Sequence, residues 1–410
     1  MKKTLSFYVK VLAAVICLIS VVFVVDTVRV RADSGETVRV STAKELKAAI
    51  KRADVGTVIF RTQAHINVTI KSAAGAKSKE LIVDAPNATV TNKAVFGRIN
   101  ILSVNEFVEK ASGNTILMSG ISDGIPMHLS VAAKKKVKSL TIYDANGHFY
   151  DGYTLRKGAK LKALELVYAG NTAPVKSSGS LSKKQFTIKY TNPYAYTCSQ
   201  KITVDADGRM TRVICDSDSA EFVYDYTFVY DENGNITKLS GKDNESGEFT
   251  TKHTYSGNLL QKTVSTVSWS SSETDYNYDK KGRLIKQVTS QEDSMDGLTY
   301  ITTWTVSFKY DKKGRLISEK NEELTHYPDG SYDDYSSVRE ETYKYNSKGF
   351  MTGKQSVGKY PNYEYTNTYA YEYSKAGDLI KETFSCPGDG SESAVEVNEY
   401  SYDEYGEPLY

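Results

Sequence analysis

The sequence is short of the residues from which most protein metal sites are built. Its 410 residues include 5 histidines and 4 cysteines, the side chains that most often bind zinc, so we expect no metal and no cofactor. Only 2 tryptophans occur, and the formal net charge is +2. Nucleic-acid binders normally carry a clear basic excess, so we expect no nucleic-acid partner. No catalytic constellation stands out, and the sequence predicts a protein that is not an enzyme.

Residues 1–32 have the pattern of a secretory signal. Lys2, Lys3 and Lys10 lie in or before an apolar stretch, and Val11 to Val25 form a 15-residue run without a charge. Val30-Arg31-Ala32 then offers a cleavage site before Asp33. Because a membrane span needs about 20 residues, we expect cleavage, a secreted or cell-surface location and no membrane contact afterwards. An uncleaved signal anchor is the alternative.

The remaining charge is divided between two halves of opposite sign. Residues 33–170 contain 20 basic and 12 acidic residues, whereas residues 171–410 contain 27 basic and 37 acidic ones. Such asymmetry indicates two domains with different surfaces. We place the first domain at 33–170, a linker at 171–195 and the second domain at 196–410.

The first half begins with one helical pattern and continues with short strands. Ser41 and Thr42 are N-cap residues, and the apolar spacing that follows predicts a helix over Ala43–Arg52. Runs of 4–7 residues rich in β-branched side chains come next, which is typical of a solenoid or sandwich. These runs are Thr57–Thr62, Ile66–Lys71, Glu80–Asp84, Ala88–Thr91, Arg98–Ser103, Thr115–Met118, His128–Ala132, Ser139–Tyr143 and Lys162–Tyr168.

This helix, with its evenly spaced strands and asparagine corners at 67, 87, 92 and 100, resembles the start of a right-handed parallel β-helix of the pectate-lyase type. The resemblance covers residues 36–130 and implies clustered acidic ligands for Ca²⁺. Only Asp84 is available at coil spacing, and we expect it to begin a turn before Pro86. Because of this resemblance, a polysaccharide lyase or hydrolase is the alternative function. It would require two acidic side chains to meet in a groove.

The densest positive run lies near the end of this half, at Lys134, Lys135, Lys136 and Lys138. It is a candidate contact for an anionic polymer, such as a wall teichoic acid or an acidic polysaccharide. The alternative is a solvated loop between two strands.

The second half contains a repeated motif. Tyr230-Asp231-Glu232-Asn233-Gly234 recurs from Tyr278 and from Tyr310, and its asparagine or arginine follows the glycine each time. The Asp carboxylate can accept a bond from the backbone two residues on, and glycine takes the positive φ that reverses the chain. Residues alternate between apolar and polar on either side, which predicts about fourteen antiparallel strands. The repeat glycines are 23 to 35 residues apart, at 208, 234, 257, 282, 314, 349, 377 and 406.

This motif resembles the YD repeats of Rhs-type bacterial surface proteins over residues 196–410. Large members of that family wrap into a shell around a C-terminal toxin, and shorter relatives are described as carbohydrate- or surface-binding. The resemblance implies a non-catalytic extracellular protein that contacts carbohydrate or the cell envelope through its repeat. A structural spacer or a remnant of a polymorphic toxin is a further alternative. The fold expected overall is mainly β: a short parallel β-helix-like domain with a capping helix, then an antiparallel β repeat.

Tyrosine is the abundant aromatic residue, and 26 of the 31 fall at or after Tyr190. Most follow the strand period and are expected to pack across strands, including the dense cluster from Tyr360 to Tyr373. Tyr327, Tyr332 and Tyr335 lie in a variable loop and have no role in the repeat. With Asp329, Asp333 and Asp334 they form the candidate ligand site, because rings can stack on sugars and carboxylates can bind hydroxyls or Ca²⁺.

Cys198 and Cys215 lie at equal distances from the Asp205–Gly208 turn. A two-residue loop would place them opposite each other, as a hairpin disulfide requires. A three-residue loop with a glycine bulge would shift the register by one and point them to opposite faces. Both arrangements remain open at this point, and the oligomeric state is undefined.

Overall fold

The computed structural model describes residues 35–121, 127–144, 152–168, 175–176, 181, 185–191, 196–219, 223–244, 247–295, 298–328, 330, 334–386, 394–402 and 408–409. The predicted signal at 1–32 lies outside these ranges, as do Asp329, Tyr332 and Asp333. Within them, no helix has the length and apolar character needed to cross a membrane.

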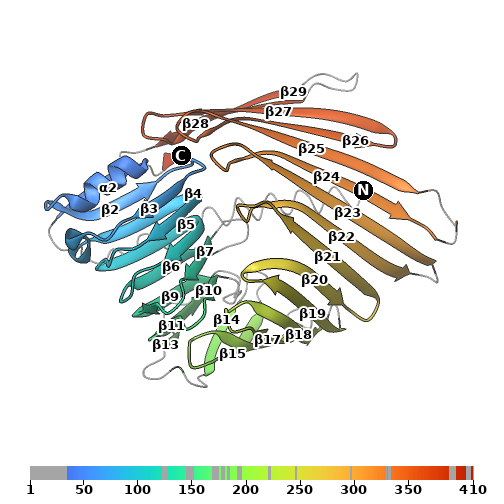
Figure 1. Ribbon diagram of the computed structural model, residues 1–410, viewed down its shortest axis with the longest axis horizontal. Helices are drawn as coiled ribbons and strands as arrows, with labels where there is room; N and C mark the ends of the chain where they lie inside the picture. Colours follow the sequence, from blue (N-terminus) through green and yellow to red (C-terminus); the bar gives the residue numbers. More distant parts are fainter. Residues whose placement is uncertain are drawn as a thin grey trace.

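The N-terminal half is a stack of coils whose strands run parallel, shown in blue and cyan in Figure 1. One column of paired strands runs β1-β2-β4-β5-β6-β9-β12, and a second runs β3-β4-β5-β7-β10. The predicted parallel β architecture is therefore confirmed. Its elements are β1 Glu36–Val40, α2 Ala43–Lys51, β2 Val55–Arg61, β3 Asn67–Ile70, the 3-10 helix Ala74–Ser78, β4 Glu80–Asn92, β5 Arg98–Glu109, β6 Thr115–Ile121, β7 Met127–Val131, β8 Lys136–Val137, β9 Ser139–Asp144, β10 Tyr153–Leu155, β11 Lys160–Leu161, β12 Leu164–Tyr168 and β13 Val175–Lys176.

Helix α2 forms where the sequence predicts it, because its start is capped and one face is apolar. Thr42 is the N-cap, and its side chain accepts a hydrogen bond from Glu45 N at 3.2 Å while Glu45 closes the capping box. Leu46, Ala49 and Ile50 are buried.

Aliphatic side chains stacked in register fill the coils. Corresponding positions of successive coils pair directly, so their side chains lie about 4.8 Å apart and pack as columns. One such column is fully buried and consists of Val58, Leu81, Ile99, Ile116, Leu140 and Leu164.

Asp84 does not begin the predicted turn, because β4 continues through it as a single strand, although the strand leaves the column of β2 at Asp84 and joins the column of β3 at Thr89, on either side of Pro86. The register against β5 shifts after Val83 and again after Ala85, and such irregularities tolerate a proline within a strand. Asp84 instead accepts a hydrogen bond from Ser103 Oγ at 2.6 Å and lies 3.0 Å from Arg61 Nε. It is thus engaged within the coil.

The second half is one antiparallel sheet of 16 strands in sequence order, compared with about fourteen expected. Strand β14 lies inside the segment predicted as a linker. The strands are β14 Gln185–Thr191, β15 Thr197–Val204, β16 Met210–Ser217, β17 Tyr224–Tyr230, β18 Ile236–Asp243, β19 Gly247–Ser256, β20 Leu259–Thr266, β21 Ser270–Tyr278, β22 Leu284–Met295, β23 Leu298–Tyr310, β24 Leu316–His326, β25 Tyr335–Tyr345, β26 Met351–Tyr360, β27 Tyr363–Tyr373, β28 Leu379–Cys386 and β29 Ala394–Glu399; β30 Ser401–Tyr402 and β31 Pro408–Leu409 pair separately.

The repeat motif forms the hairpin turns at one edge of this sheet, as predicted. The seven repeat glycines described have φ between 61° and 100°, and Gly406 lies outside the described residues. At Asp279, the carboxylate accepts bonds from Lys281 N at 2.8 Å and Arg283 N at 3.0 Å. Just before this turn, between Asn277 and Tyr278, the register against β22 shifts.

The first strands of the sheet cover the end of the coil stack, and the later strands form a single layer. Phe186, Ile202 and Val213 belong to the same buried cluster as the coil core. From residue 229 onward, Phe350 is the one described apolar side chain that is buried, at 5% exposure. We call the side of the sheet that bears Phe186, Ile202 and Val213 the inner face, and strand register continues it along the whole sheet.

The sheet touches the coil stack at both of its ends, so that the chain forms an arch (Figure 1). Near the start of the sheet, Leu161 N donates to Asp207 O at 2.9 Å. Near its end, His65 N donates to Gly349 O at 2.9 Å, and Arg39 pairs with Asp378. The glycine turns thus dock on the last coils at one end and on the first coils at the other.

Candidate functional site

Tyrosines that begin the repeat turns have a structural role. Arg283 lies 4.7 Å over the ring of Tyr310, whose hydroxyl donates to Leu284 O at 2.8 Å. Arg315 lies 4.7 Å over the Tyr345 ring, and burial raises the pKa of Tyr345 to about 12. Each repeat arginine therefore joins its own turn to the tyrosine of the next one.

Another group of tyrosines has no such role and forms what we call the tyrosine platform: Tyr335, Tyr360, Tyr363 and Tyr365. It lies on the inner face at the edge opposite the glycine turns. The Tyr360 and Tyr363 rings stack with their centroids 4.4 Å apart at 7°, and the Tyr360 and Tyr365 rings at 6.2 Å and 23°. Tyr363 is 55% exposed and Tyr335 is 38% exposed, so aromatic surface remains open to a ligand.

A glycine allows the platform to lie flat on the sheet. A Cβ at Gly358 would approach Tyr365 Cε1 to 2.1 Å, so the ring covers a position where other residues carry a side chain. Arg339 is the cross-strand partner of Gly358 on the other side, and its side chain is 50% exposed. A cationic donor therefore lies beside the aromatic surface.

Next to Arg339 is a buried carboxylate with several donors. Glu341 pairs with Arg339, lies 2.9 Å from Lys354 Nζ, and accepts a hydrogen bond from the Tyr343 hydroxyl at 2.6 Å. Burial alone would raise the pKa of Glu341, but the bonds from Tyr343, Lys354 and Arg339 hold it below its usual value. The same burial, with the Glu341 bond, raises the pKa of Tyr343. Ionised Glu341 thus fixes the direction of the surrounding donors.

Flat rings beside fixed polar groups are typical of small-molecule and carbohydrate sites. The apolar face of a ring takes up hydrophobic surface, and a few placed polar groups set orientation. The platform and the Arg339–Glu341–Lys354 cluster together have this composition.

The predicted loop site is brought together only in part. Tyr335 belongs to the platform, whereas Tyr327 packs against Tyr300 with centroids 5.9 Å apart. Asp334 lies 2.9 Å from His326 Nδ1. Tyr332, Asp329 and Asp333 lie outside the described residues. The sequence assigned Tyr360, Tyr363 and Tyr365 to packing across strands and not to the ligand site, although the Pro361-Asn362 turn between two closely spaced tyrosines was a signal for an open surface.

The predicted lysine run lies on the outside of the coil stack. Lys134, Lys136 and Lys138 are exposed, and Lys135 is half-buried. Lys134 has a φ of 62°, the one positive value found for a non-glycine residue in the described part of the chain. Lys135 favours the charged form of nearby Glu109.

The two cysteines of the first hairpin are not directly opposite each other. Cys198 pairs with Ser217, and Cys215 pairs with Gln200. The turn between Val204 and Met210 is longer than either predicted loop, and the register shifts once more between Thr203 and Val204. Pairing is therefore displaced by two residues, and both thiols lie buried on one face. The structure contains them as thiols, and Cys198 Sγ lies 3.5 Å from Ser217 Oγ. The observed register therefore differs from the one that a disulfide between Cys198 and Cys215 requires.

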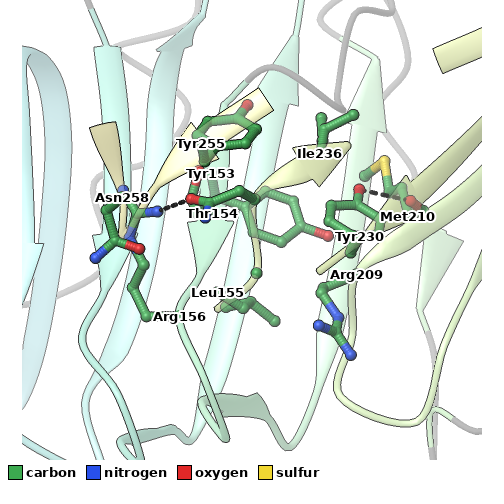
Figure 2. A pocket seen from close by; sticks show the side chains of 12 residues that line it. Tyr153, Thr154, Leu155, Arg156, Arg209, Met210, Tyr230, Ile236, Tyr255 and Asn258 are labelled. Carbon is green, nitrogen blue, oxygen red and sulfur yellow. Dashed lines mark hydrogen bonds between the residues drawn. The ribbon is translucent and has the colours of Figure 1, made fainter. Parts of the chain in front are cut away.

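A cavity of about 190 Å³ lies where the coil stack meets the first repeat turns (Figure 2). Its polar groups bind one another: the Tyr153 hydroxyl donates to Gly208 O at 2.6 Å, and Arg156 Nη1 donates to Asn235 Oδ1 at 2.7 Å. Ligand pockets usually measure roughly 300–1,000 Å³. We interpret this cavity as part of the junction.

The part of the chain that the structure describes contains no group of three or more His, Cys, Asp or Glu residues placed to hold a metal ion. Sequence reasoning did not single out Glu109, which is fully buried. Burial raises its pKa to about 7, although Asn92, Ala111 and Asn114 donate hydrogen bonds to it.

Comparisons with known proteins give little further information. No protein-family model and no curated protein matches the chain. Among solved structures, it is similar to the one described as "Crystal Structure of TcdB2-TccC3-TEV", at 11% sequence identity and a TM-score of 0.13. The match covers 57% of this chain and 18% of that one. A similarity at this TM-score carries no conclusion about function.

Proposed function

We propose that this chain is an exported, non-catalytic binding protein that holds a carbohydrate chain against the tyrosine platform of its repeat sheet. The signal-like pattern of residues 1–32 supports export, and the likeness of the motif to YD repeats supports a role at a cell surface or in the extracellular medium. The observation that carries the proposal is the stacked pair Tyr360 and Tyr363, which is left 55% exposed at Tyr363.

Sugar binding fits the chemistry next to that pair. The rings offer a flat apolar surface to the C–H face of a pyranose, and Arg339 and Lys354 offer donors to its hydroxyls. Because the sheet is a single layer here, the platform needs no rearrangement to accept a chain that runs across β25, β26 and β27.

The test is a glycan array with the full-length chain, followed by calorimetric titration of an oligosaccharide that binds. Aromatic pairs contribute about 0.5–1.5 kcal/mol each; we expect each ring–sugar contact to contribute a similar amount, and 1.4 kcal/mol corresponds to about tenfold in affinity. We therefore expect the double variant Tyr335→Ala/Tyr363→Ala to bind at least about tenfold more weakly.

The matched control is Tyr196→Ala, because Tyr196 is 37% exposed and Tyr335 is 38% exposed. We expect this control to bind like the unaltered chain, and both variants to keep the far-ultraviolet circular dichroism of the parent. Absence of any bound glycan, or an equal loss in the control, would contradict the proposal.

A further inference from the structure

Exposed lysines of successive coils are stacked along the N-terminal half. Ile70, Asn92 and Glu109 pair with one another across β3, β4 and β5. Lys71, Lys93 and Lys110 each follow one of these residues, and all three are exposed. The backbone ladder continues through them, since Lys93 N donates to Ile70 O at 2.9 Å and Lys110 N donates to Asn92 O at 2.8 Å. Their side chains therefore leave three neighbouring coils at the same position.

On the next coil, Ala132 occupies the column position, and the predicted lysine run begins two residues after it. Ala132 N donates to Glu109 O at 2.9 Å, and Lys136 N donates to Ser112 Oγ at 3.2 Å, so the coil of Lys134 to Lys138 lies directly on the coil of Lys110. One coil further, Lys136 pairs with Lys160 in parallel register. Lys162 N donates to Val137 O at 3.0 Å. Val137 and Leu161 point into the core, and the lysines on either side of them are exposed.

We call the six residues Lys71, Lys93, Lys110, Lys134, Lys136 and Lys138 the lysine stripe. Acidic residues of the coils form ion pairs with arginines outside the stripe, for example Asp84 with Arg61 and Glu80 with Arg98. Lys157 and Lys160 pair with Glu232 and Asp207 of the repeat turns. Within the described residues, no ion pair is found for any member of the stripe.

Neighbouring strands lie about 4.8 Å apart, and like charges directly opposite each other on paired strands repel. A column of this kind is most favourable when a line of negative charge lies along it. Binding then releases the counterions of the polymer, which makes the affinity depend on salt. Lysine is a compact point charge without the bidentate geometry of arginine, so the stripe recognises charge spacing and not one particular acid group.

We propose that the lysine stripe binds a linear polyanion, in which phosphate or carboxylate groups repeat along an unbranched chain without bases. The stripe contains only lysines and no aromatic ring, whereas proteins that bind single-stranded nucleic acid stack bases on aromatic side chains. This site is separate from the tyrosine platform, and either one can fail without the other.

The test measures binding of the full-length chain to fluorescently labelled poly(glycerol phosphate) and polygalacturonate by anisotropy, over a series of salt concentrations. The quadruple variant Lys93→Gln/Lys110→Gln/Lys136→Gln/Lys138→Gln should bind at least tenfold more weakly. Each lost contact lowers the slope of log K against log salt by about 0.7, so the slope should fall by about 3. Preference for one polymer identifies phosphate or carboxylate as the recognised group.

The matched control removes the same charge from exposed lysines outside the stripe, as Lys44→Gln/Lys47→Gln/Lys51→Gln/Lys348→Gln. It should bind nearly as well as the parent. Tyr335→Ala/Tyr363→Ala should bind poly(glycerol phosphate), which has no sugar ring for the tyrosine platform, as tightly as the parent. An equal loss in the lysine control would overturn the proposal, because net charge alone would then explain binding. Tighter binding of single-stranded DNA than of both polymers would also overturn it and indicate a nucleic-acid partner.

Discussion

Glu109 is a carboxylate inside the coil stack, and the side chains of Asn92 and Asn114 donate hydrogen bonds to it. Ile70, Val131 and Leu155 occupy the matching positions of other coils, and Asn92 and Glu109 occupy the positions between them. The carboxylate is fully buried and its bonds to Asn92 and Asn114 are 3.0 and 2.9 Å long. A titratable carboxylate therefore lies inside the core.

This burial makes stability depend on pH in a defined window. The pKa of Glu109 is raised from 4.5 to about 7 in the folded chain, so between these values the folded state binds more protons than the unfolded state. The contribution of Glu109 to the free energy of unfolding is then largest below pH 4.5 and falls, by up to about 3 kcal/mol, as the pH rises to 7. Urea unfolding at pH 4.5, 6 and 7.5 measures this contribution.

The variant Glu109→Gln provides the comparison, because it keeps the size of the side chain and removes its titration. We expect the difference in unfolding free energy between parent and variant to change steadily across this window. A difference that stays constant with pH would show that Glu109 keeps an ordinary pKa.

At the scale of elements, the repeat turns differ in what surrounds their glycines. Gly234 has a φ of 82°, and a Cβ there would lie 1.8 Å from Leu155 O. Gly257 has a φ of 61°, and nothing lies within 4 Å of its Cβ position. A repeat glycine thus lies once in a five-residue turn that docks on the coils and once in a two-residue turn in open space.

The pair Gly234→Ala and Gly257→Ala separates these two functions. Gly257→Ala should lower the free energy of unfolding by about 1 kcal/mol, the cost of a left-handed conformation for a residue with a Cβ. Gly234→Ala should cost more than this, because the Cβ also pushes the turn away from β10. Chemical denaturation with hydrogen exchange at Leu155 and Arg156 measures both effects, and equal losses would contradict the docking role of Gly234.

The comparison of turns and coils shows what local sequence can predict. The turns were predictable because Asp, Gly and the bonds between them lie within five residues. The continuity of β4 was not, since it depends on partners for Asp84 from β2 and β5. The register of Cys198 and Cys215 also failed, because it depends on the number of residues in the turn and the bulge beside it.

The platform shows the same limit at the candidate site. Tyrosine spacing predicts which rings share a face, but the exposure of Tyr363 depends on the absence of a second layer over the sheet. The column of Lys71, Lys93 and Lys110 could not be predicted either, because the coils differ in length and only the observed register aligns the three residues.

At the scale of the whole molecule, the arch is closed by a buried ion pair. The Arg39 and Asp378 side chains are 12% and 8% exposed, and removal of one partner from a buried pair costs about 3–5 kcal/mol. Arg39→Met should therefore destabilise the chain by about 3 kcal/mol, and adding Asp378→Asn should cost less than the sum of the two single changes.

A double-mutant cycle in urea measures this coupling, with hydrogen exchange in β28 and β29 as a local readout. The control is Arg52→Met, because Arg52 pairs with Glu36 and Asp54 at the surface, where its side chain is 43% exposed, and solvent screens such exposed pairs. Additive effects at positions 39 and 378 would show that the pair does not hold the arch closed.

Closure of the arch also sets an order of events during folding. Arg39 and Asp378 are 339 residues apart in the sequence, and contacts between such distant residues form slowly because a long loop must close first. The coils and the strands β14–β17 that cover their end can form once residues up to Tyr230 are present, and the later hairpins of the repeat can add to the sheet one at a time. The turns at Gly349 and Gly377 reach the first coils only after nearly the entire chain is present, so the N-terminal coils receive their final partners last.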